Sequence, residues 1–81
     1  MRVHLQFFAH CRDVAGVGEA DITLPENATL ADLEAAVTAE HPGLKRLWRS
    51  LAFAVNEVIV RSGHPLKDGD RVALLPPIAG G

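Results

Sequence analysis

The chain has 81 residues, of which 48% are hydrophobic and 22% are charged, and its formal net charge is −2. This length allows one domain with a thin core and leaves little room for a deep catalytic cleft. The composition excludes a disordered chain, the lack of a basic run argues against a nucleic-acid partner, and the single cysteine excludes an internal disulfide or a multi-cysteine metal site.

The first part of the chain predicts two strands separated by a short helix. Residues 2–8 alternate between two faces, as in a β-strand, and residues 20–24 predict a second strand. Residues 9–15 can form a short helix that stops before two glycines, and we expect the flanking strands to pair as a hairpin. The two faces of the first strand carry Val3, Leu5 and Phe7 on one side and His4, Gln6 and Phe8 on the other.

The clearest helix begins after Thr29. This residue forms a capping-box pattern with Asp32, and an apolar stripe at helical spacing follows it. The stripe consists of Leu30, Leu33, Ala36 and Val37. The His-Pro-Gly segment at 41–43 ends the helix, and residues 44–51 suggest further helical turns in which Trp48 anchors to the core.

The second half of the chain predicts three more strands. Residues 51–55 and 58–61 form two of them, joined by a tight turn at Asn56-Glu57, because asparagine tolerates a positive φ. Residues 67–70 form a turn that leads into the last strand at 71–75. The order strand, strand, helix, strand, strand, strand predicts an α+β fold of the ubiquitin type. We expect a mixed sheet of about five strands with one main helix across one face.

The segment 76–81, Pro-Pro-Ile-Ala-Gly-Gly, differs from the rest in composition. Two prolines end the strand and favour an extended tail, which can reach about 20 Å from the domain at 1–75. A carboxylate is a poor electrophile and must be activated, for example as an acyl-adenylate, before it accepts a nucleophile. Glycine lets the backbone enter a narrow activating site without Cβ clashes. Gly81 is therefore the candidate reactive residue, and Gly80 shapes access to it.

These C-terminal residues carry a resemblance to a known family. The run from Val72 to Gly81, after Asp68-Gly69-Asp70, resembles the C-terminal signature of the small subunit of molybdopterin synthase, the MoaD family. The segments Leu5-Gln6-Phe7-Phe8-Ala9 and His64-Pro65-Leu66 are similar to that family as well, and the resemblance covers the whole chain. One departure is Leu74-Leu75, where the family often has two aromatic residues.

The resemblance implies a β-grasp fold and a sulfur-carrier function. In that family an E1-like enzyme uses ATP to adenylate the terminal glycine, here Gly81, and a sulfur donor converts the adenylate to a thiocarboxylate. The donor can be a sulfurtransferase or a cysteine desulfurase. The tail then enters the large subunit of the synthase and donates sulfur to cyclic pyranopterin monophosphate. We therefore expect a non-catalytic subunit of a heterotetramer, without a permanently bound cofactor.

The alternation of the strands predicts a docking face. Val58 and Val60 should face inward, as should Val72 and Leu74, which leaves one large apolar residue on the outer face of each of three strands. If these strands are neighbours, the three residues form an apolar patch near the root of the tail, and such patches mark partner sites. The predicted partner-binding residues are Phe8, Ile59, Leu75, Pro76, Pro77, Ile78 and Ala79.

Other candidate sites have simpler interpretations. Cys11 beside His10 is interpreted as a small, semi-buried thiol, because adjacent helical residues point in different directions. The four histidines lack metal-ligand spacing. The first residues do not follow the signal-peptide pattern and no stretch is apolar enough to span a membrane, so we expect a cytoplasmic protein.

Three alternative functions stay open from the residues alone. The chain could carry sulfur for another pathway, such as thiamine synthesis or tRNA thiolation. It could be a ubiquitin-like modifier that is joined through Gly81 to a lysine. It could also be a plain interaction module in which the terminal glycines are incidental.

Overall fold

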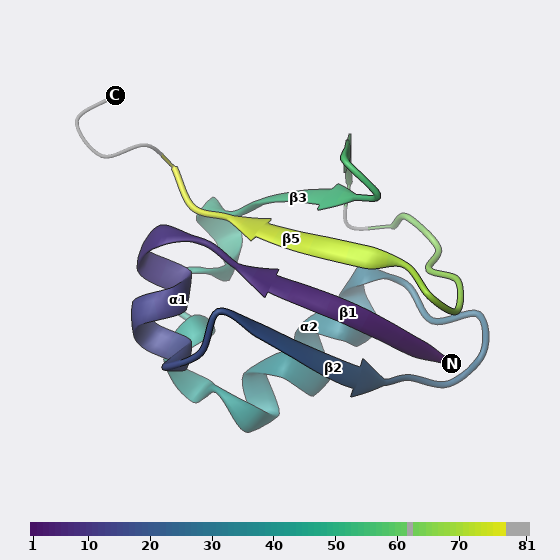
Figure 1. Cartoon of the computed structure of the whole chain (residues 1–81), viewed down its shortest axis with the longest axis horizontal. Helices are drawn as coiled ribbons and strands as arrows, with labels where there is room; N and C mark the ends of the chain where they lie inside the picture. The colour runs from purple at the N-terminus through teal and green to yellow at the C-terminus, as the bar shows by residue number, and fades with distance from the viewer. Residues whose placement is uncertain (62, 78–81) are drawn as a thin grey trace.

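Five strands form one mixed sheet, in which the first and last strands are adjacent. The structure is a computed structural model that describes residues 1–61 and 63–77. The strands are β1 (Arg2–Phe7), β2 (Glu19–Thr23), β3 (Ala52–Val55), β4 (Val58–Val60) and β5 (Arg71–Leu75). Their order is β2-β1-β5-β3-β4, with β1 and β5 parallel and the other pairs antiparallel (Figure 1).

One face of the sheet is covered and the other is open. Helix α2 (Leu30–Glu40) crosses behind the sheet in Figure 1, and α1 (Ala9–Ala15) lies at the end of β1. Two short 3₁₀ turns follow α2, η1 (Pro42–Leu44) and η2 (Trp48–Ser50). This arrangement confirms the expected α+β, β-grasp fold. The first two strands pair as expected, with α1 inside their connection. Within the described part of the chain, no helix is long and apolar enough to cross a membrane.

The core lies between the covered face and α2. The inward side chains of β1 are at most 3% exposed, and the buried residues of α2 and the inner residues of β5 are at most 1% exposed. These side chains are Val3, Leu5 and Phe7; Leu30, Leu33 and Val37; and Val72 and Leu74. Trp48 also packs against the core, 5.2 Å from Phe53 between ring centroids. Each large apolar side chain buried here contributes roughly 1.5–3 kcal/mol to stability.

Local signals place the helix and the turns as the sequence predicts. The capping box is present at the start of α2, where the Thr29 N–H donates to the Asp32 carboxylate at 2.9 Å. Asn56 and Glu57 both have positive φ angles, 50° and 72°, which is the geometry of a type I′ turn. Gly69, at φ 85°, closes the turn before β5.

A buried carboxylate holds the turn at 67–70 against the hairpin of β3 and β4. Asp70 is 9% exposed, and its two oxygens accept hydrogen bonds from the Asn56 side-chain amide at 2.9 Å and the Lys67 N–H at 2.8 Å. The Asn56 side-chain oxygen accepts in turn from the Arg71 N–H at 3.0 Å. The His4 N–H donates to the Asp70 carbonyl oxygen at 2.9 Å. These bonds define where β5 begins relative to β1 and β3.

The inner face predicted for Val58 is correct, but the side chain is not buried. Val60 packs partly against the core as expected, but Val58 is 63% exposed. Its register partner on β3, Val55, is buried, so Val58 lies on the inner side of the sheet. β4 is the edge strand, and no described element covers its inner side at this residue. Alternation predicts the face of a strand residue but not whether another layer reaches it.

We predict that Gly43→Ala destabilises the fold, because α1 and η1 approach closely. A Cβ on Gly43 would lie 2.7 Å from the Val14 Cγ1 atom, which belongs to a short, branched side chain that cannot swing away. Such overpacking costs roughly 1–3 kcal/mol of unfolding free energy, measurable by urea denaturation. Gly63→Ala is the matched control, because a Cβ there meets no atom within 4 Å. Equal stabilities for the two variants would contradict this close approach.

Candidate functional site

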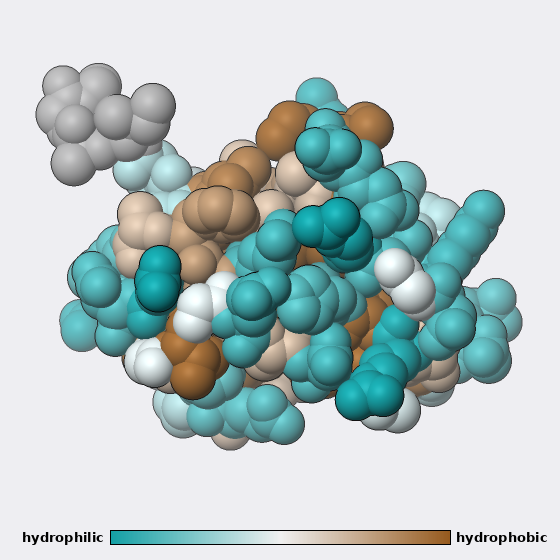
Figure 2. Space-filling model, viewed as in Figure 1, coloured by the Kyte–Doolittle hydropathy of each residue, from teal (hydrophilic) through white to brown (hydrophobic). Residues whose placement is uncertain are grey.

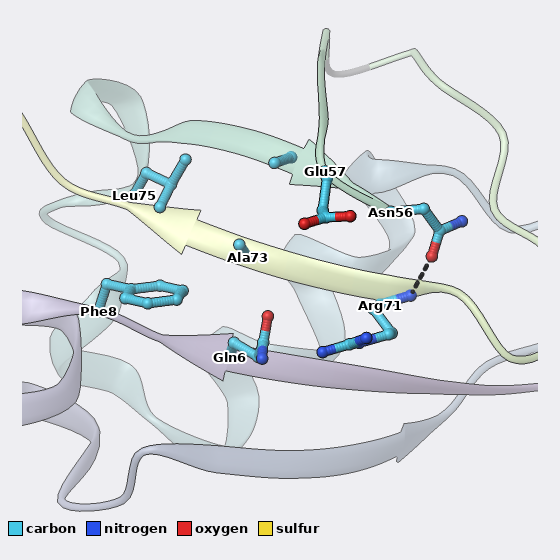
Figure 3. Close-up of a pocket in the computed structure, with 8 residues that line it drawn as sticks. Gln6, Phe8, Asn56, Glu57, Arg71, Ala73 and Leu75 are labelled. Atoms are coloured by element: carbon cyan, nitrogen blue, oxygen red, sulfur yellow. Dashed lines mark hydrogen bonds between the residues drawn. The ribbon is translucent and has the colours of Figure 1, made fainter.

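The open face of the sheet contains a shallow hollow beside the end of β5. Its volume is about 400 Å³. The hollow is lined by residues from β1, β5, the β3–β4 hairpin and Phe8, which follows β1 (Figure 3). They are Gln6, Phe8, Ala54, Asn56, Glu57, Arg71, Ala73 and Leu75.

Strand register explains the shape of this hollow. Ala73 on β5 pairs with Gln6 on one side and with Ala54 on the other, so small side chains occupy its middle. Phe8 and Leu75 stand at the end where β5 finishes, and Figure 3 shows them facing each other across the sheet. Phe8 is 45% exposed, and Leu75 is half-buried. Figure 2 shows apolar surface near the end of β5, whereas polar side chains cover much of the surface toward its start.

The predicted apolar patch is only partly contiguous. Phe8 and Leu75 come together because β1 and β5 are neighbours, as expected. The full patch required all three strands to be neighbours, and this condition is not met, because β3 lies between β5 and β4. Ile59 is 65% exposed and pairs with Ala54, so it lies next to this small residue on the side away from β5. Phe8 and Leu75 are therefore the contiguous part of the patch, and Ile59 is separated from them by β3.

The residues of the predicted tail divide between described and undescribed segments. Pro76 is half-buried and Pro77 is exposed, directly after the end of β5. The predicted partner-binding residues Ile78 and Ala79, and the predicted reactive residues Gly80 and Gly81, lie outside the described residues. The structure therefore places the root of the tail beside Phe8 and Leu75.

A left-handed residue positions Phe8. Ala9 has a φ of 47°, a conformation that costs an alanine about 1 kcal/mol or more. The chain turns sharply there, so that α1 starts directly after Phe8, whose carbonyl accepts from the Cys11 N–H at 3.0 Å. Sequence reasoning missed this feature, because no sequence signal marks an alanine for a left-handed turn. It also missed the hollow with its polar rim. The available signal for the hollow was the pair of small residues Ala54 and Ala73.

A charged cluster borders the polar half of the open face. His4 lies between two carboxylates of β2, with Nδ1 2.8 Å from Asp21 and Nε2 2.7 Å from Glu19. These hydrogen bonds, first that of Asp21 and then that of Glu19, raise the pKa of His4 above its ordinary value. The same His4 contact, with the nearby positive charge of Arg2, lowers the pKa of Asp21. Arg71 is the register neighbour of His4 on β5, so the cluster continues to the rim of the hollow.

The other candidate residues are structural. Cys11 is fully buried, more so than expected, and burial raises the pKa of its thiol, which disfavours the nucleophilic thiolate. His41 ends α2 and packs edge-on against Phe7, with ring centroids 5.7 Å apart. Among the described residues, no three histidine, cysteine, aspartate or glutamate side chains are grouped to hold a metal ion.

Comparison with known proteins assigns the family. The sequence profile of the ThiS family matches residues 5–81. The chain belongs to the ThiS family. It is 41% identical to the molybdopterin synthase sulfur carrier subunit of Chlamydomonas reinhardtii, over 100% of both chains. It is 31% identical to the protein of the same name from Homo sapiens, over 99% of this chain and 94% of the relative. These relatives confirm the resemblance to molybdopterin synthase small subunits.

Solved structures confirm the fold. The crystal structure of SAMP1 from Haloferax volcanii has a TM-score of 0.90 and 26% identity, with 100% of both chains covered. The complex of subunits 1 and 2 of the molybdopterin-converting factor from Helicobacter pylori contains a chain with a TM-score of 0.72 and 33% identity, again with 100% of both covered. The fold of this chain thus occurs in SAMP1 and in a complex of two molybdopterin-converting-factor subunits.

We predict that the His4 cluster makes stability fall as the pH rises above the ordinary histidine pKa. Because its folded-state pKa is raised, His4 contributes its full stabilisation below its ordinary pKa of about 6.5 and loses it as the pH rises through the higher folded value. An NMR titration of the imidazole should report the raised pKa. Asp21→Asn should lower it more than Glu19→Gln, because the Asp21 bond is the larger cause. An unperturbed His4 in the intact protein would contradict the cluster.

Proposed function

We propose that this chain is the sulfur carrier subunit of a molybdopterin synthase, acting in the cytoplasm. The observation that carries the proposal is the end-to-end similarity to relatives of that name, 41% identical in one case. The C-terminal run Leu-Leu-Pro-Pro-Ile-Ala-Gly-Gly supports it, because it supplies a tail for carboxylate chemistry. The complex of the two converting-factor subunits from Helicobacter pylori supports a large-subunit partner.

The proposed chemistry activates the Gly81 carboxylate in two steps. An E1-like adenylating enzyme transfers AMP from ATP to the carboxylate and releases pyrophosphate, which gives the carbonyl carbon a good leaving group. A sulfur donor, a sulfurtransferase or a cysteine desulfurase, then presents a persulfide whose outer sulfur displaces AMP to form an acyl disulfide. A thiol attacks the donor's sulfur of this disulfide, which forms a new disulfide on the donor and releases the thiocarboxylate. The tail delivers this sulfur to cyclic pyranopterin monophosphate in the large subunit, and two deliveries complete the dithiolene. The carrier needs no resident cofactor, because ATP is used by the activating enzyme.

The fold suits this role through the position of β5. This strand lies between β1 and β3, so the chain leaves the domain from the middle of the sheet. Pro76 and Pro77 have no N–H to donate and cannot extend the strand ladder. We propose that residues 1–75 form the domain and that residues 76–81 form an extended, flexible tail. Gly80 would then admit the backbone to a narrow site, with Gly81 at the reacting position.

The hollow beside the tail root provides the docking surface of the proposal. Phe8 and Leu75 present apolar surface next to Pro76. Ile59, which pairs with Ala54 on β3, adds exposed apolar surface farther along the open face. We propose that these residues, together with residues 76–79 of the tail, contact the large subunit. One carrier docked at each end of a dimer of large subunits would give a heterotetramer. In this arrangement the carrier supplies sulfur and the large subunit holds the pterin.

A protein modifier is the second candidate function. The chain is 30% identical to small archaeal modifier protein 3 of Haloferax volcanii, over 100% of both chains. Both functions need the same activated Gly81 and differ in the acceptor. Intact mass spectrometry, after incubation with ATP, an E1-like enzyme and a sulfur donor, separates them. Replacement of one terminal oxygen by sulfur supports the carrier, a lysine-linked conjugate supports the modifier, and an unchanged mass contradicts both.

Deletion of Gly81 should abolish activation and leave the fold intact. The residue has no side chain to contribute to the core, so we expect an almost unchanged melting temperature. Formation of the acyl-adenylate should be lost, because the carboxylate is displaced by one residue from the activating site. Adding one residue after Gly81 should have the same effect for the same reason. Robust sulfur transfer by the deleted protein would refute the assignment of Gly81.

A Phe8→Glu, Leu75→Glu double variant should bind the large subunit much more weakly. Burying each of these side chains at an interface contributes roughly 1.5–3 kcal/mol, so the two together are worth several kcal/mol of affinity. Calorimetric titration measures the loss, and circular dichroism checks the fold. Val17→Glu is the matched control, because Val17 is 44% exposed, close to the 45% of Phe8, but does not line the hollow. Wild-type affinity in a well-folded double variant would eliminate this docking face.

A further inference from the structure

Two adjoining grooves follow the inner side of β4. The first, of about 550 Å³, lies between the start of α2, η2 and the β3–β4 hairpin. The second, of about 430 Å³, lies between the turn end of the hairpin and residues 64–67. Val60 lines both, so the two grooves meet there, and we call them together the inner groove. Because α2 crosses behind the sheet in Figure 1, the inner groove and the hollow of Figure 3 lie on opposite faces.

The middle of the inner groove is apolar. Trp48 and Phe53, whose ring centroids are 5.2 Å apart, line the first groove together with Val60. Val58 lines the second groove and is 63% exposed, although its register partner Val55 is buried. No described element covers Val58, so this apolar surface is available to another molecule.

Cationic side chains line both ends of the inner groove. Arg49 from η2 and Arg61 directly after β4 line one end, and Lys67 lines the other. All three are exposed, and within residues 1–61 and 63–77 none of them forms an ion pair. Two acidic residues also contribute, Glu34 to the first groove and Asp70 to the second, but the Asp70 carboxylate already accepts two hydrogen bonds. The ends of the groove therefore offer more positive than negative charge to a partner.

This positive charge is local, because the chain as a whole has a formal net charge of −2. Residues 41–56, which lead from the end of α2 to the hairpin, contain Lys45, Arg46 and Arg49 and no acidic residue. A positive field on one part of an acidic protein favours an anionic partner. The apolar middle disfavours nucleic acid, whose backbone is charged at every nucleotide and would lose its hydration there. Protein side chains, in contrast, combine apolar and acidic groups.

We propose that the inner groove binds an extended acidic segment of a partner protein, with apolar side chains in its middle and carboxylates at both ends. The apolar side chains pack against Val58 and Val60, and the carboxylates pair with Arg49 and Arg61 at one end and with Lys67 at the other. Residues 58–61 span about 10 Å, so a segment of about five to seven residues is long enough. The site lies on the face opposite the proposed docking surface, so this proposal does not depend on the proposed function.

The peptide Glu-Glu-Leu-Val-Leu-Glu-Glu, labelled with fluorescein, tests the proposal on the full chain. Fluorescence anisotropy measures its dissociation constant, which should rise with salt concentration because the ion pairs are exposed. Arg61→Glu and Lys67→Glu should each raise the dissociation constant about fivefold, because each turns an attraction at one end of the groove into a repulsion. Arg12→Glu is the matched control, since it makes the same charge change at an exposed residue of α1 that does not line the inner groove. Circular dichroism checks that each variant is folded.

Two further peptides separate this recognition from simple charge attraction. Replacing the apolar residues of the peptide by serine, or its glutamates by lysine, should abolish binding, and amide NMR shifts caused by the parent peptide should centre on residues 58–61 and 67. The proposal is overturned if the parent peptide causes no shifts at roughly millimolar concentration, or shifts only the open face around Phe8 and Leu75. It is also overturned if the serine peptide or a single-stranded RNA binds as tightly, or if Arg12→Glu weakens binding as much as Arg61→Glu does.

Discussion

The parallel pairing of β1 with β5 at the centre of the sheet is the constraint on which the rest of the structure depends. It brings the two ends of the domain together, and its register is set by the turn that precedes β5. There, the buried Asp70 carboxylate accepts hydrogen bonds from the Asn56 side-chain amide and the Lys67 N–H. The backbone carbonyl oxygen of Asp70 accepts from the His4 N–H. A buried charge without partners is costly, so these bonds select one starting point for β5. The end of β5 then follows, with Leu75 beside Phe8 and next to the tail.

The open face owes its character to this register. The covered face supplies the core, so side chains on the open face are free to serve contacts with other molecules. Two alanines, at 54 and 73, meet in adjacent strands and leave a hollow that larger residues would fill. The apolar side chains of Phe8 and Leu75 lie at the end of that hollow next to the tail, and the charged residues Arg71 and His4 lie toward the start of β5. A partner that docks there would meet apolar surface beside the emerging tail and polar groups farther away.

The small domain does not fully cover the inner side of the edge strand β4. Inner residues of β1, β5 and β3 are buried, but at β4 the inner side is only partly covered. Ile59 belongs to two surfaces, because its side chain lies on the open face and its backbone lies on the free edge.

Local patterns in the sequence determined the elements of this protein and its family. The alternation of residues 2–8, the Thr29–Asp32 capping box and the Asn56-Glu57 turn depend on neighbours within a few residues, and all three appear as expected. Strand order, the exposure of Val58 and the left-handed Ala9 depend on contacts between distant segments, and only the tertiary structure decided them. Likewise, His4 gains its two carboxylates only when β2 pairs with β1. The physical reason is that a period of two assigns a side chain to a face, whereas the layer or strand that lies against that face is chosen by the packing of the whole chain.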